Sequence, residues 1–253
     1  MKSRVSTFES APPARSGVRI TATPRLWRSK RKSTTSVNRR LAQERRLLRA
    51  DPELGRVIAA VTARIGPQRI KHSKASPFEA LIRAVVYQSV SGKAAATIFA
   101  HLKDWLGGDF RPAAVAKKSP SALASVGLSG GKARAIRGLA EWFCANPRVA
   151  RRIADLSDEE IIASLTNIPG IGLWTVNVFL IFSLGRPDVI PSGDMGIRRG
   201  VQLVCNLPRP ATPSQVRERS QRWQPYRSLA SIYLWNATKL NFTQKDLKAR
   251  SKS

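Results

Sequence analysis

The stretch that decides the fold is Leu165-Thr-Asn-Ile-Pro-Gly-Ile-Gly-Leu-Trp-Thr-Val-Asn-Val-Phe-Leu180, in which a Pro-Gly-Ile-Gly turn separates two apolar segments. Ser157 and Glu160 have the spacing of a capping box, which predicts the start of the first helix. Pro169 predicts its end, because the residue before a proline disfavours the α conformation. A second helix is expected to begin near Leu173. The sequence therefore predicts two helices joined by a tight turn.

The turn between these helices has the features of an anion site. Gly170 and Gly172 can adopt positive φ and allow another backbone to approach, so we expect neither to tolerate a β-branched residue. The N–H groups at the start of the second helix have no partner within that helix and carry partial positive charge. Together they predict a phosphate seat that needs no basic side chain. Its residues are Pro169, Gly170, Ile171, Gly172 and Thr175.

A second loop follows the hairpin and ends in Ile190-Pro-Ser-Gly-Asp-Met-Gly-Ile-Arg-Arg-Gly200, which places Asp194 22 residues after Gly172. The stretch from Leu165 to Asp194 resembles the helix-hairpin-helix of the base-excision DNA glycosylases, with the Gly/Pro-rich loop and aspartate that follow it in that superfamily (HhH-GPD). The hairpin would span about residues 157–184. The alternative is a helical hairpin with a glycine turn and a surface aspartate.

The segment from Leu81 to Leu102 resembles the Leu-Ile-Arg-x-x-x-x-Gln-x-x-Ser-x-x-Ala-Ala stretch of the 3-methyladenine DNA glycosylases of the AlkA type. In that family the turn between the two helices supplies a wedge that fills the gap left by a flipped base. Ser89 stands where the family usually has Gln or Leu. Either Val90 or Gln88 fills the gap, or this part of the resemblance fails and the segment is only a polar turn.

Two further segments extend the resemblance, which covers about residues 53–240. Gly127-Leu-Ser-Gly-Gly-Lys132 is similar to the family's Gly-Leu-Ser-x-x-Lys, and Lys132 and Arg134 are either phosphate contacts or part of a solvated face. Trp223-Gln-Pro-Tyr-Arg-Ser-Leu-Ala-Ser-Ile-Tyr-Leu-Trp235 is similar to the last core helix. In that family the final tryptophan, here Trp235, faces the active-site cleft.

Charge is the strongest signal in the composition. The net charge of +28 indicates a polyanionic partner, most simply nucleic acid, with solubility as the alternative. Residues 1–50 hold 14 Lys/Arg and 2 acidic residues, and the remaining 203 hold 30 and 14, so both parts are basic. The sequence contains no run of 18 apolar residues, so it predicts no membrane-spanning helix. Two cysteines cannot form a four-cysteine zinc or iron–sulfur site, and we expect no cofactor.

The chain is expected to contain one folded domain between two tails. Residues 1–48 are rich in Arg, Ser, Thr and Pro and predict a disordered basic tail. That tail could contact DNA, direct targeting or reflect an over-extended start codon. Residues 49–245 would form the glycosylase domain, and residues 246–253 a basic C-terminal tail. We expect a monomer, in the bacterial cytoplasm at the nucleoid or, in a eukaryote, in the nucleus.

No strand pattern is present, which predicts an all-α domain. Helical spacing is expected over 53–65, from Ser76-Pro77 to the turn at 87–92, over 94–105, in two short helices over 121–143, and from Met195 to Leu207. The resemblance implies the helix-hairpin-helix glycosylase fold, with two helical subdomains flanking a cleft. It also implies that the N-terminal β-domain of longer AlkA-type enzymes is missing.

The chemistry of base excision gives Asp194 a role. The nucleotide must first rotate out of the duplex into a pocket. The transition state has oxocarbenium character at the sugar, so a fixed anion beside it lowers the barrier. A carboxylate that lies ~4 Å from the developing positive charge on the sugar stabilises that charge by ~4 kcal/mol at an effective dielectric of about 20. Asp194 is the candidate, and it can also orient or deprotonate the attacking water.

Trp174 determines the expected subtype. In members of this superfamily that also cut the strand, its position is a lysine that forms a Schiff base. A tryptophan has no amine, which predicts a monofunctional enzyme. Trp174 and Trp235 could stack on a cationic alkylated purine, with an attraction of roughly 0.5–2 kcal/mol, or could simply pack in the core. The family tyrosine four residues after Trp174 is Val178 here.

These observations predict a monofunctional glycosylase that removes alkylated purines, 3-methyladenine and 7-methylguanine, from double-stranded DNA. A non-catalytic helix-hairpin-helix DNA-binding protein is the alternative. A glycosylase for mismatched or oxidised bases is disfavoured, because the lysine and the cluster cysteines are missing. In the family, the hairpin carbonyls, here residues 168–172, also hold a monovalent cation that bridges to phosphate. The resemblance alone supports that site.

Overall fold

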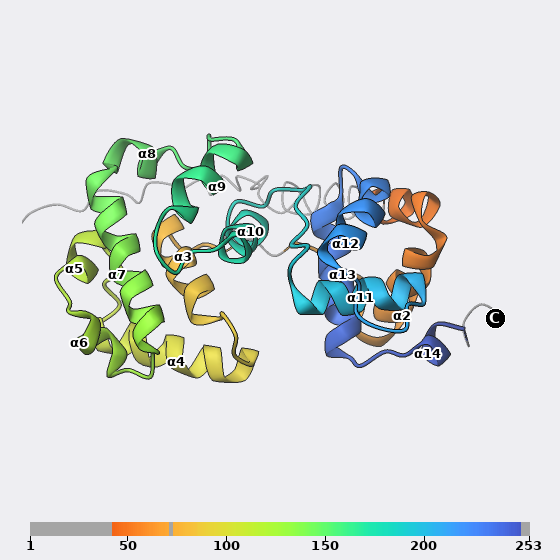
Figure 1. Ribbon diagram of the computed structural model, residues 1–253, viewed down its shortest axis with the longest axis horizontal. Helices are drawn as coiled ribbons and strands as arrows, with labels where there is room; N and C mark the ends of the chain where they lie inside the picture. Colours follow the sequence, from red (N-terminus) through yellow and green to blue (C-terminus); the bar gives the residue numbers. More distant parts are fainter. Residues whose placement is uncertain (1–41, 71–72, 249–253) are drawn as a thin grey trace, which may run out of the picture. The chain divides into compact units, whose positions relative to one another are not determined.

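The computed structural model describes residues 42–70 and 73–248, and every regular element in that part of the chain is helical (Figure 1). This confirms the predicted all-α fold. After a helix over residues 42–50, the elements are α2 (Pro52–Ile65), α3 (Pro77–Val86), α4 (Gly92–Trp105), α5 (Pro112–Ala116), α6 (Pro120–Ala124), α7 (Gly130–Ala145), α8 (Pro147–Arg151), α9 (Asp158–Thr166), α10 (Leu173–Phe182), α11 (Met195–Cys205), α12 (Pro213–Ser220), the 3₁₀ turn η1 (Gln221–Trp223), α13 (Arg227–Lys239) and α14 (Gln244–Lys248). None of the helices in these described residues combines the length and apolar character needed to cross a bilayer.

Local capping signals define the starts of these helices. The Ser157 hydroxyl accepts a hydrogen bond from the Glu160 N–H at 3.2 Å, and the Glu160 carboxylate accepts one from the Ser157 N–H at 2.7 Å. The predicted capping box is therefore confirmed. The same type of side-chain cap starts α3 at Ser76, which is followed by a proline at the first helical position. Such caps satisfy N–H groups that a helix cannot pair internally.

The helices enclose two hydrophobic cores. The first is built from α3 to α10 and contains large buried side chains such as Leu81, Ile136 and Phe179. The second is built from residues 42–50, α2 and α11 to α14, and it contains Leu54, Trp223 and Tyr233. Helices α2 and α13 lie side by side in the second core, so the start and the end of the domain pack together (Figure 1).

The folded domain extends beyond both predicted boundaries. Residues 42–50 are helical, and Leu47 is only 1% exposed, so the expected tail ends before residue 48. At the other end, α14 buries Leu247 to 4% exposure, beyond the predicted limit at residue 245. These residues pack in the second core, which a polar tail would not do. Residues 1–41 and 249–253, the larger part of both predicted tails, lie outside the described residues.

The last core helix begins later than the third sequence match suggests. Helix α13 starts at Arg227, and Trp223 belongs to the preceding 3₁₀ turn. The Trp223 side chain is fully buried, and its indole N–H donates to the Asp51 carboxylate at 2.8 Å. The predicted pair of short helices over 121–143 is likewise one short helix, α6, and one long helix, α7.

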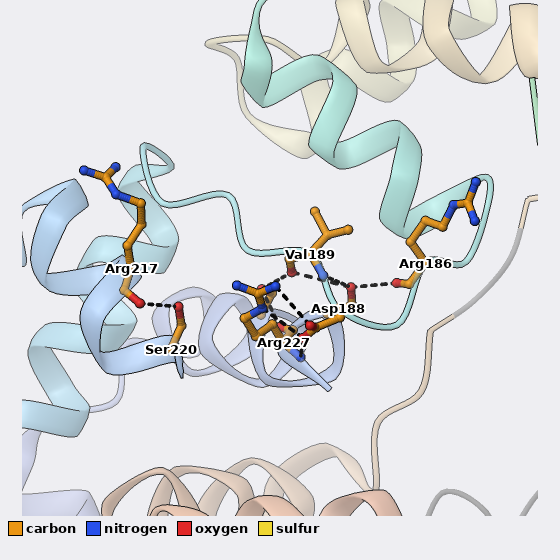
Figure 2. A network of polar contacts seen from close by, with 8 residues as sticks. Arg186, Asp188, Val189, Arg217, Ser220 and Arg227 are labelled. Atoms are coloured by element: carbon orange, nitrogen blue, oxygen red, sulfur yellow. Dashed lines mark hydrogen bonds and ion pairs between the residues drawn. The ribbon is translucent and has the colours of Figure 1, made fainter. Parts of the chain in front are cut away.

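The segment that joins α10 to α11 is fastened to the start of α13 (Figure 2). The Arg227 guanidinium donates to both oxygens of Asp188, at 2.8 and 2.9 Å, and the two side chains point toward one another. The Ser228 hydroxyl donates to the Arg186 carbonyl at 2.7 Å and accepts from the Val189 N–H at 2.9 Å. Bidentate arginine–carboxylate pairs have a defined geometry, so this network holds the chain that leads to Asp194.

Candidate active site

Asp194 lies at the start of α11 and receives three hydrogen bonds. Its Oδ1 accepts from the Ile197 N–H at 2.9 Å, which makes Asp194 the N-cap of that helix. The same oxygen accepts from the Trp235 indole N–H at 2.8 Å, and Oδ2 accepts from the Trp174 indole N–H at 2.6 Å. An ionised carboxylate can only accept hydrogen bonds, and all three neighbours are donors. The structure thus brings Trp174 and Trp235, two of the predicted substrate-binding residues, into hydrogen-bond contact with Asp194, the predicted catalytic residue.

The two tryptophans approach Asp194 from different elements. Trp174 is in the first turn of α10, and Trp235 is on α13; both are half-buried. The Trp235 ring stacks on Phe182, with ring centroids 5.7 Å apart and an interplanar angle of 28°. It packs against both hydrophobic cores. Both indoles therefore use their polar edges on the Asp194 carboxylate, in addition to the packing of their rings.

The predicted hairpin is present between α9 and α10. Gly170 has φ +86°, a conformation that favours glycine, and a Cβ there would lie 2.7 Å from the Cβ of Ala135 on α7. Gly172 has φ −93° and open space where a Cβ would be. A Cβ at residue 172 thus meets no obstacle within the protein, so the space at this position does not by itself account for the expectation that Gly172 tolerates no β-branched residue. As the N-cap, Gly172 has no side chain to bond the first-turn N–H groups of α10.

Two predicted hairpin contacts are possible only through the backbone. The Ile171 side chain is 2% exposed, and the Thr175 side chain is 1% exposed. Pro169, Gly170 and Gly172 are exposed. A phosphate at this turn would consequently meet N–H groups and glycine surface, as the sequence argument requires.

The predicted basic residues Lys132 and Arg134 lie at the start of α7, beside the hairpin. The Lys132 ammonium donates to the Val86 carbonyl at the end of α3, at 2.8 Å. Burial lowers the pKa of this half-buried ammonium. Arg134 is exposed. Lys132 therefore binds a helix end within the protein, whereas Arg134 faces solvent.

The turn between α3 and α4 is tied to the hairpin by Gln88. The Gln88 side-chain amide donates to the Gly170 carbonyl at 3.0 Å and to the Thr175 hydroxyl at 2.7 Å. Ser89 and Val90 are exposed, and Ser89 has φ +54°, an uncommon value for a residue with a side chain. Of the two residues considered for the wedge, Gln88 is engaged inside the protein, and Val90, 39% exposed, is accessible.

Three features of this site were not predicted from the sequence. The pattern contained no signal for the two indole hydrogen bonds, which join residues 20 and 41 positions apart from Asp194. It also missed Phe182, which supports Trp235, and Gly196, whose backbone lies against both Asp194 and Trp235. The glycine two residues after Asp194, in Asp-Met-Gly at 194–196, was a hint of the contact at Gly196, because glycine lets other groups approach the backbone closely.

Of the hairpin carbonyls that the family resemblance assigns to a monovalent cation, those of Ile168, Gly170 and Gly172 already accept hydrogen bonds. The Ile168 carbonyl accepts from the Ile171 N–H at 2.9 Å, the Gly170 carbonyl from Gln88, and the Gly172 carbonyl from the Val176 N–H at 3.2 Å. A carbonyl oxygen has two lone pairs, so each retains one acceptor site. These carbonyls fit a cation only through that second lone pair.

The structure has an all-α domain with a helix-hairpin-helix, followed by a carboxylate at the start of the next helix, which is the arrangement that the resemblance to the helix-hairpin-helix DNA glycosylases implies. The chain belongs to the HhH-GPD superfamily of base excision DNA repair proteins, whose sequence model matches residues 82–225. It is a DNA glycosylase of this superfamily.

Known proteins resemble the chain in sequence and in structure. DNA-3-methyladenine glycosylase 1 of Schizosaccharomyces pombe is 38% identical over 170 residues, which cover 66% of this chain and 75% of that protein. The solved complex of S. pombe 3-methyladenine DNA glycosylase (Mag1) with abasic DNA has a TM-score of 0.72 at 33% identity, covering 80% of this chain and 99% of that one. A DNA-3-methyladenine glycosidase from Bacillus halodurans has a TM-score of 0.67 at 28% identity, covering 82% and 96%.

Proposed function

We propose that the chain is a monofunctional alkylpurine DNA glycosylase, which hydrolyses the N-glycosidic bond of 3-methyladenine and 7-methylguanine in duplex DNA. The observation that carries the proposal is the Asp194 carboxylate, held by the indole N–H groups of Trp174 and Trp235 and by the Ile197 N–H. The names of the relatives above support the substrate class. The enzyme acts as a monomer and needs no cofactor.

Asp194 provides a fixed negative charge for the transition state. As the glycosidic bond lengthens, positive charge develops on the sugar, and an oriented carboxylate stabilises it without having to reorganise. The three hydrogen bonds supply that orientation. The same carboxylate orients the water that attacks the sugar carbon, and takes its proton. An alkylated purine already carries positive charge, so it leaves without a general acid.

The aromatic residues provide the recognition of a cationic base. Phe182 covers one face of Trp235, so the base meets the opposite face of that ring and the face of Trp174. Cation–π attraction contributes roughly 0.5–2 kcal/mol, which favours an alkylated base over its neutral parent. Because the indole N–H groups are already bonded to Asp194, they do not read the edge of the base. This arrangement selects by charge, and it suits several alkylated purines.

DNA is bound by the hairpin and the neighbouring turn. The first-turn N–H groups of α10 and the glycine surface of the hairpin hold a backbone phosphate, and Arg134 adds a charged contact. The exposed Ser89-Val90 turn enters the duplex, where Val90 fills the space that the flipped nucleotide leaves. Gln88 holds this turn against the hairpin. Trp174 in place of a lysine excludes a Schiff base at that position and leaves the strand intact.

The proposal is tested by incubating the protein with methylated duplex DNA and measuring both free bases and strand breaks. We expect release of intact 3-methyladenine, with 7-methylguanine, and abasic strands that break only after alkali or heat. Asp194→Asn should abolish release while duplex binding is kept or strengthened, because a negative charge near phosphate is removed. Asp104→Asn, at an exposed site on α4, is the matched control and should retain full activity.

Three outcomes would contradict the proposal. Strand breaks without alkali would exclude a monofunctional enzyme. Efficient release of 8-oxoguanine or uracil, with none of 3-methyladenine, would exclude the substrate class. Turnover of Asp194→Asn within about tenfold of wild type, a difference of about 1.4 kcal/mol in barrier, would exclude its catalytic role.

A further inference from the structure

The hydrogen bonds around Asp194 leave one acceptor position unused. A carboxylate has about four lone-pair sites, two on each oxygen. Oδ1 accepts two hydrogen bonds, from Trp235 and Ile197, and Oδ2 accepts one, from Trp174. The remaining lone pair is therefore on Oδ2, and the direction of that lone pair is set by the three donors.

The two indole donors are themselves fixed in place. An indole N–H is a donor only, so this atom has a single use in each tryptophan. Trp235 is held by its stack on Phe182 and by contact with both cores. Trp174 lies in the first turn of α10, directly after the hairpin, and its bond to Oδ2 is short, at 2.6 Å. Asp194 is thus held by one donor from α10, one from α13 and one from its own helix.

Gly196 makes the contact between Asp194 and Trp235 possible. A Cβ at residue 196 would lie 2.9 Å from Cδ1 of Trp235 and 3.0 Å from Oδ1 of Asp194. A Cβ at residue 196 could therefore be admitted only if the indole of Trp235, the carboxylate of Asp194 or the backbone at residue 196 shifted. The Gly196 carbonyl accepts a hydrogen bond from the Thr238 hydroxyl at 2.9 Å, which fastens this backbone to the helix that carries Trp235.

We propose that Trp174, Trp235 and Gly196 are positioning residues for Asp194. The two indole N–H groups and the bare backbone at 196 hold the carboxylate in the one orientation that leaves the free lone pair of Oδ2 for the attacking water. This inference rests on the proposed function and adds a second role to the tryptophans. Their faces contact the base, and their polar edges orient the catalytic group.

Replacement by phenylalanine separates the two roles, because phenylalanine keeps an aromatic face and loses the N–H donor. Trp174→Phe and Trp235→Phe should each lower the single-turnover rate of base release by about ten- to hundredfold, since small misplacements of a reacting group cost that much. The affinity of each variant for alkylated duplex DNA should stay within about twofold of the wild-type affinity, because the aromatic face remains. A tenfold change would correspond to about 1.4 kcal/mol of binding free energy. Trp105→Phe, at a 39% exposed position at the end of α4, is the control and should match wild type.

Gly196→Ala tests the same arrangement without altering either tryptophan. It should lower the single-turnover rate by about the same ten- to hundredfold factor. Gly193→Ala is the matched control, because a Cβ at residue 193 would have open space. Thermal unfolding of each variant establishes that the loss is in the rate and not in the folded fraction.

A measurement without activity gives an independent test. The chain has six tryptophans, so ¹H–¹⁵N spectra contain up to six indole N–H signals, and the Phe variants assign those of Trp174 and Trp235. In Asp194→Asn these two signals should shift, because an amide has only one acceptor atom. The Trp105 signal should stay in place.

The outcomes distinguish the two proposals. If wild type releases no alkylated base, the proposed function fails whatever the variants do. If wild type is active and both Phe variants keep rates within about threefold, or about 0.7 kcal/mol in barrier, the positioning role is overturned. Unmoved Trp174 and Trp235 signals in Asp194→Asn would also overturn it.

Discussion

At the scale of single residues, the two hairpin glycines have different roles. Gly170 needs its glycine for folding, since its φ is +86° and a Cβ would contact Ala135 at 2.7 Å. Gly172 has ordinary backbone and open space, so folding does not require glycine there. We propose that glycine at residue 172 serves DNA binding, because a side chain at the N-cap would cover the N–H groups that the proposed function offers to phosphate.

A matched pair of serine substitutions tests this difference. Gly170→Ser should lower the free energy of unfolding by about 1–3 kcal/mol, from positive φ and overpacking. Gly172→Ser should leave it unchanged or raise it slightly, because serine is a good N-cap, and should weaken duplex DNA binding. Urea unfolding and fluorescence anisotropy measure the two effects. Equal destabilisation by both variants would contradict the distinction.

At the scale of elements, Asp51 joins three parts of the second core. It caps α2 through the Leu54 N–H at 3.1 Å, and it accepts from Arg219 of α12 at 2.7 Å and from Trp223 of η1 at 2.8 Å. The side chain is fully buried. Burial opposes ionisation, but the hydrogen bonds from Arg219, Trp223 and Leu54, with the charge of Arg219, hold the pKa of Asp51 below its ordinary value.

Asp51→Ala should destabilise the domain by about 3–5 kcal/mol, because removing one member of a buried ion pair leaves the charge of the other, here Arg219, without compensation. The lowered pKa also predicts a pH dependence. Its contribution is complete above the ordinary carboxyl pKa and is lost as the pH falls below about 4, toward the lower pKa of the folded state. In Asp51→Asn, the free energy of unfolding, measured between about pH 2 and 6, should decrease less steeply as the pH falls. Asp104→Asn, at an exposed site, should leave this pH dependence unchanged. If Asp51→Asn loses stability at low pH as steeply as wild type, Asp51 is not the cause of the pH dependence.

At the scale of the whole molecule, the basic charge is divided between the folded domain and the sequence before it. Residues 1–41 contain 11 Lys/Arg and one Glu. The described domain starts with the helix over residues 42–50, in which Leu47 is buried and Glu44 accepts a hydrogen bond from the Tyr233 hydroxyl. Burial and this bond raise the pKa of Tyr233 to about 12. The helix is part of the second core and not of a tail.

Two truncations separate charge from folding. A chain that starts at residue 42 should melt like the full chain and retain single-turnover chemistry. Its binding to undamaged duplex should be weaker and less dependent on salt, because fewer counterions are released. A chain that starts at residue 49 should be destabilised by about 2–5 kcal/mol, since Leu47 is removed from the core. Equal melting temperatures for the two truncations would show that the helix does not contribute to stability.

The local features of this protein could be predicted from its amino-acid sequence. The capping box at Ser157 and Glu160, the stop at Pro169 and the start of α10 depend on residues within a few positions of one another, so they could be predicted. The resemblance of the hairpin and the following loop to the superfamily made Asp194 the candidate carboxylate. Charge and the absence of a strand pattern indicated a nucleic-acid partner and an all-α domain, and the superfamily assignment confirms both.

The contacts between these parts became known from the three-dimensional structure. The indole bonds to Asp194, the tie from Gln88 to the hairpin and the space around Gly172 depend on side chains far apart in sequence. Helix 42–50 was hidden for the same reason: its composition is that of a polar tail, and only burial of Leu47 in the second core stabilises it. Packing between distant segments follows from the shape and polarity of all partners together, which no local pattern records.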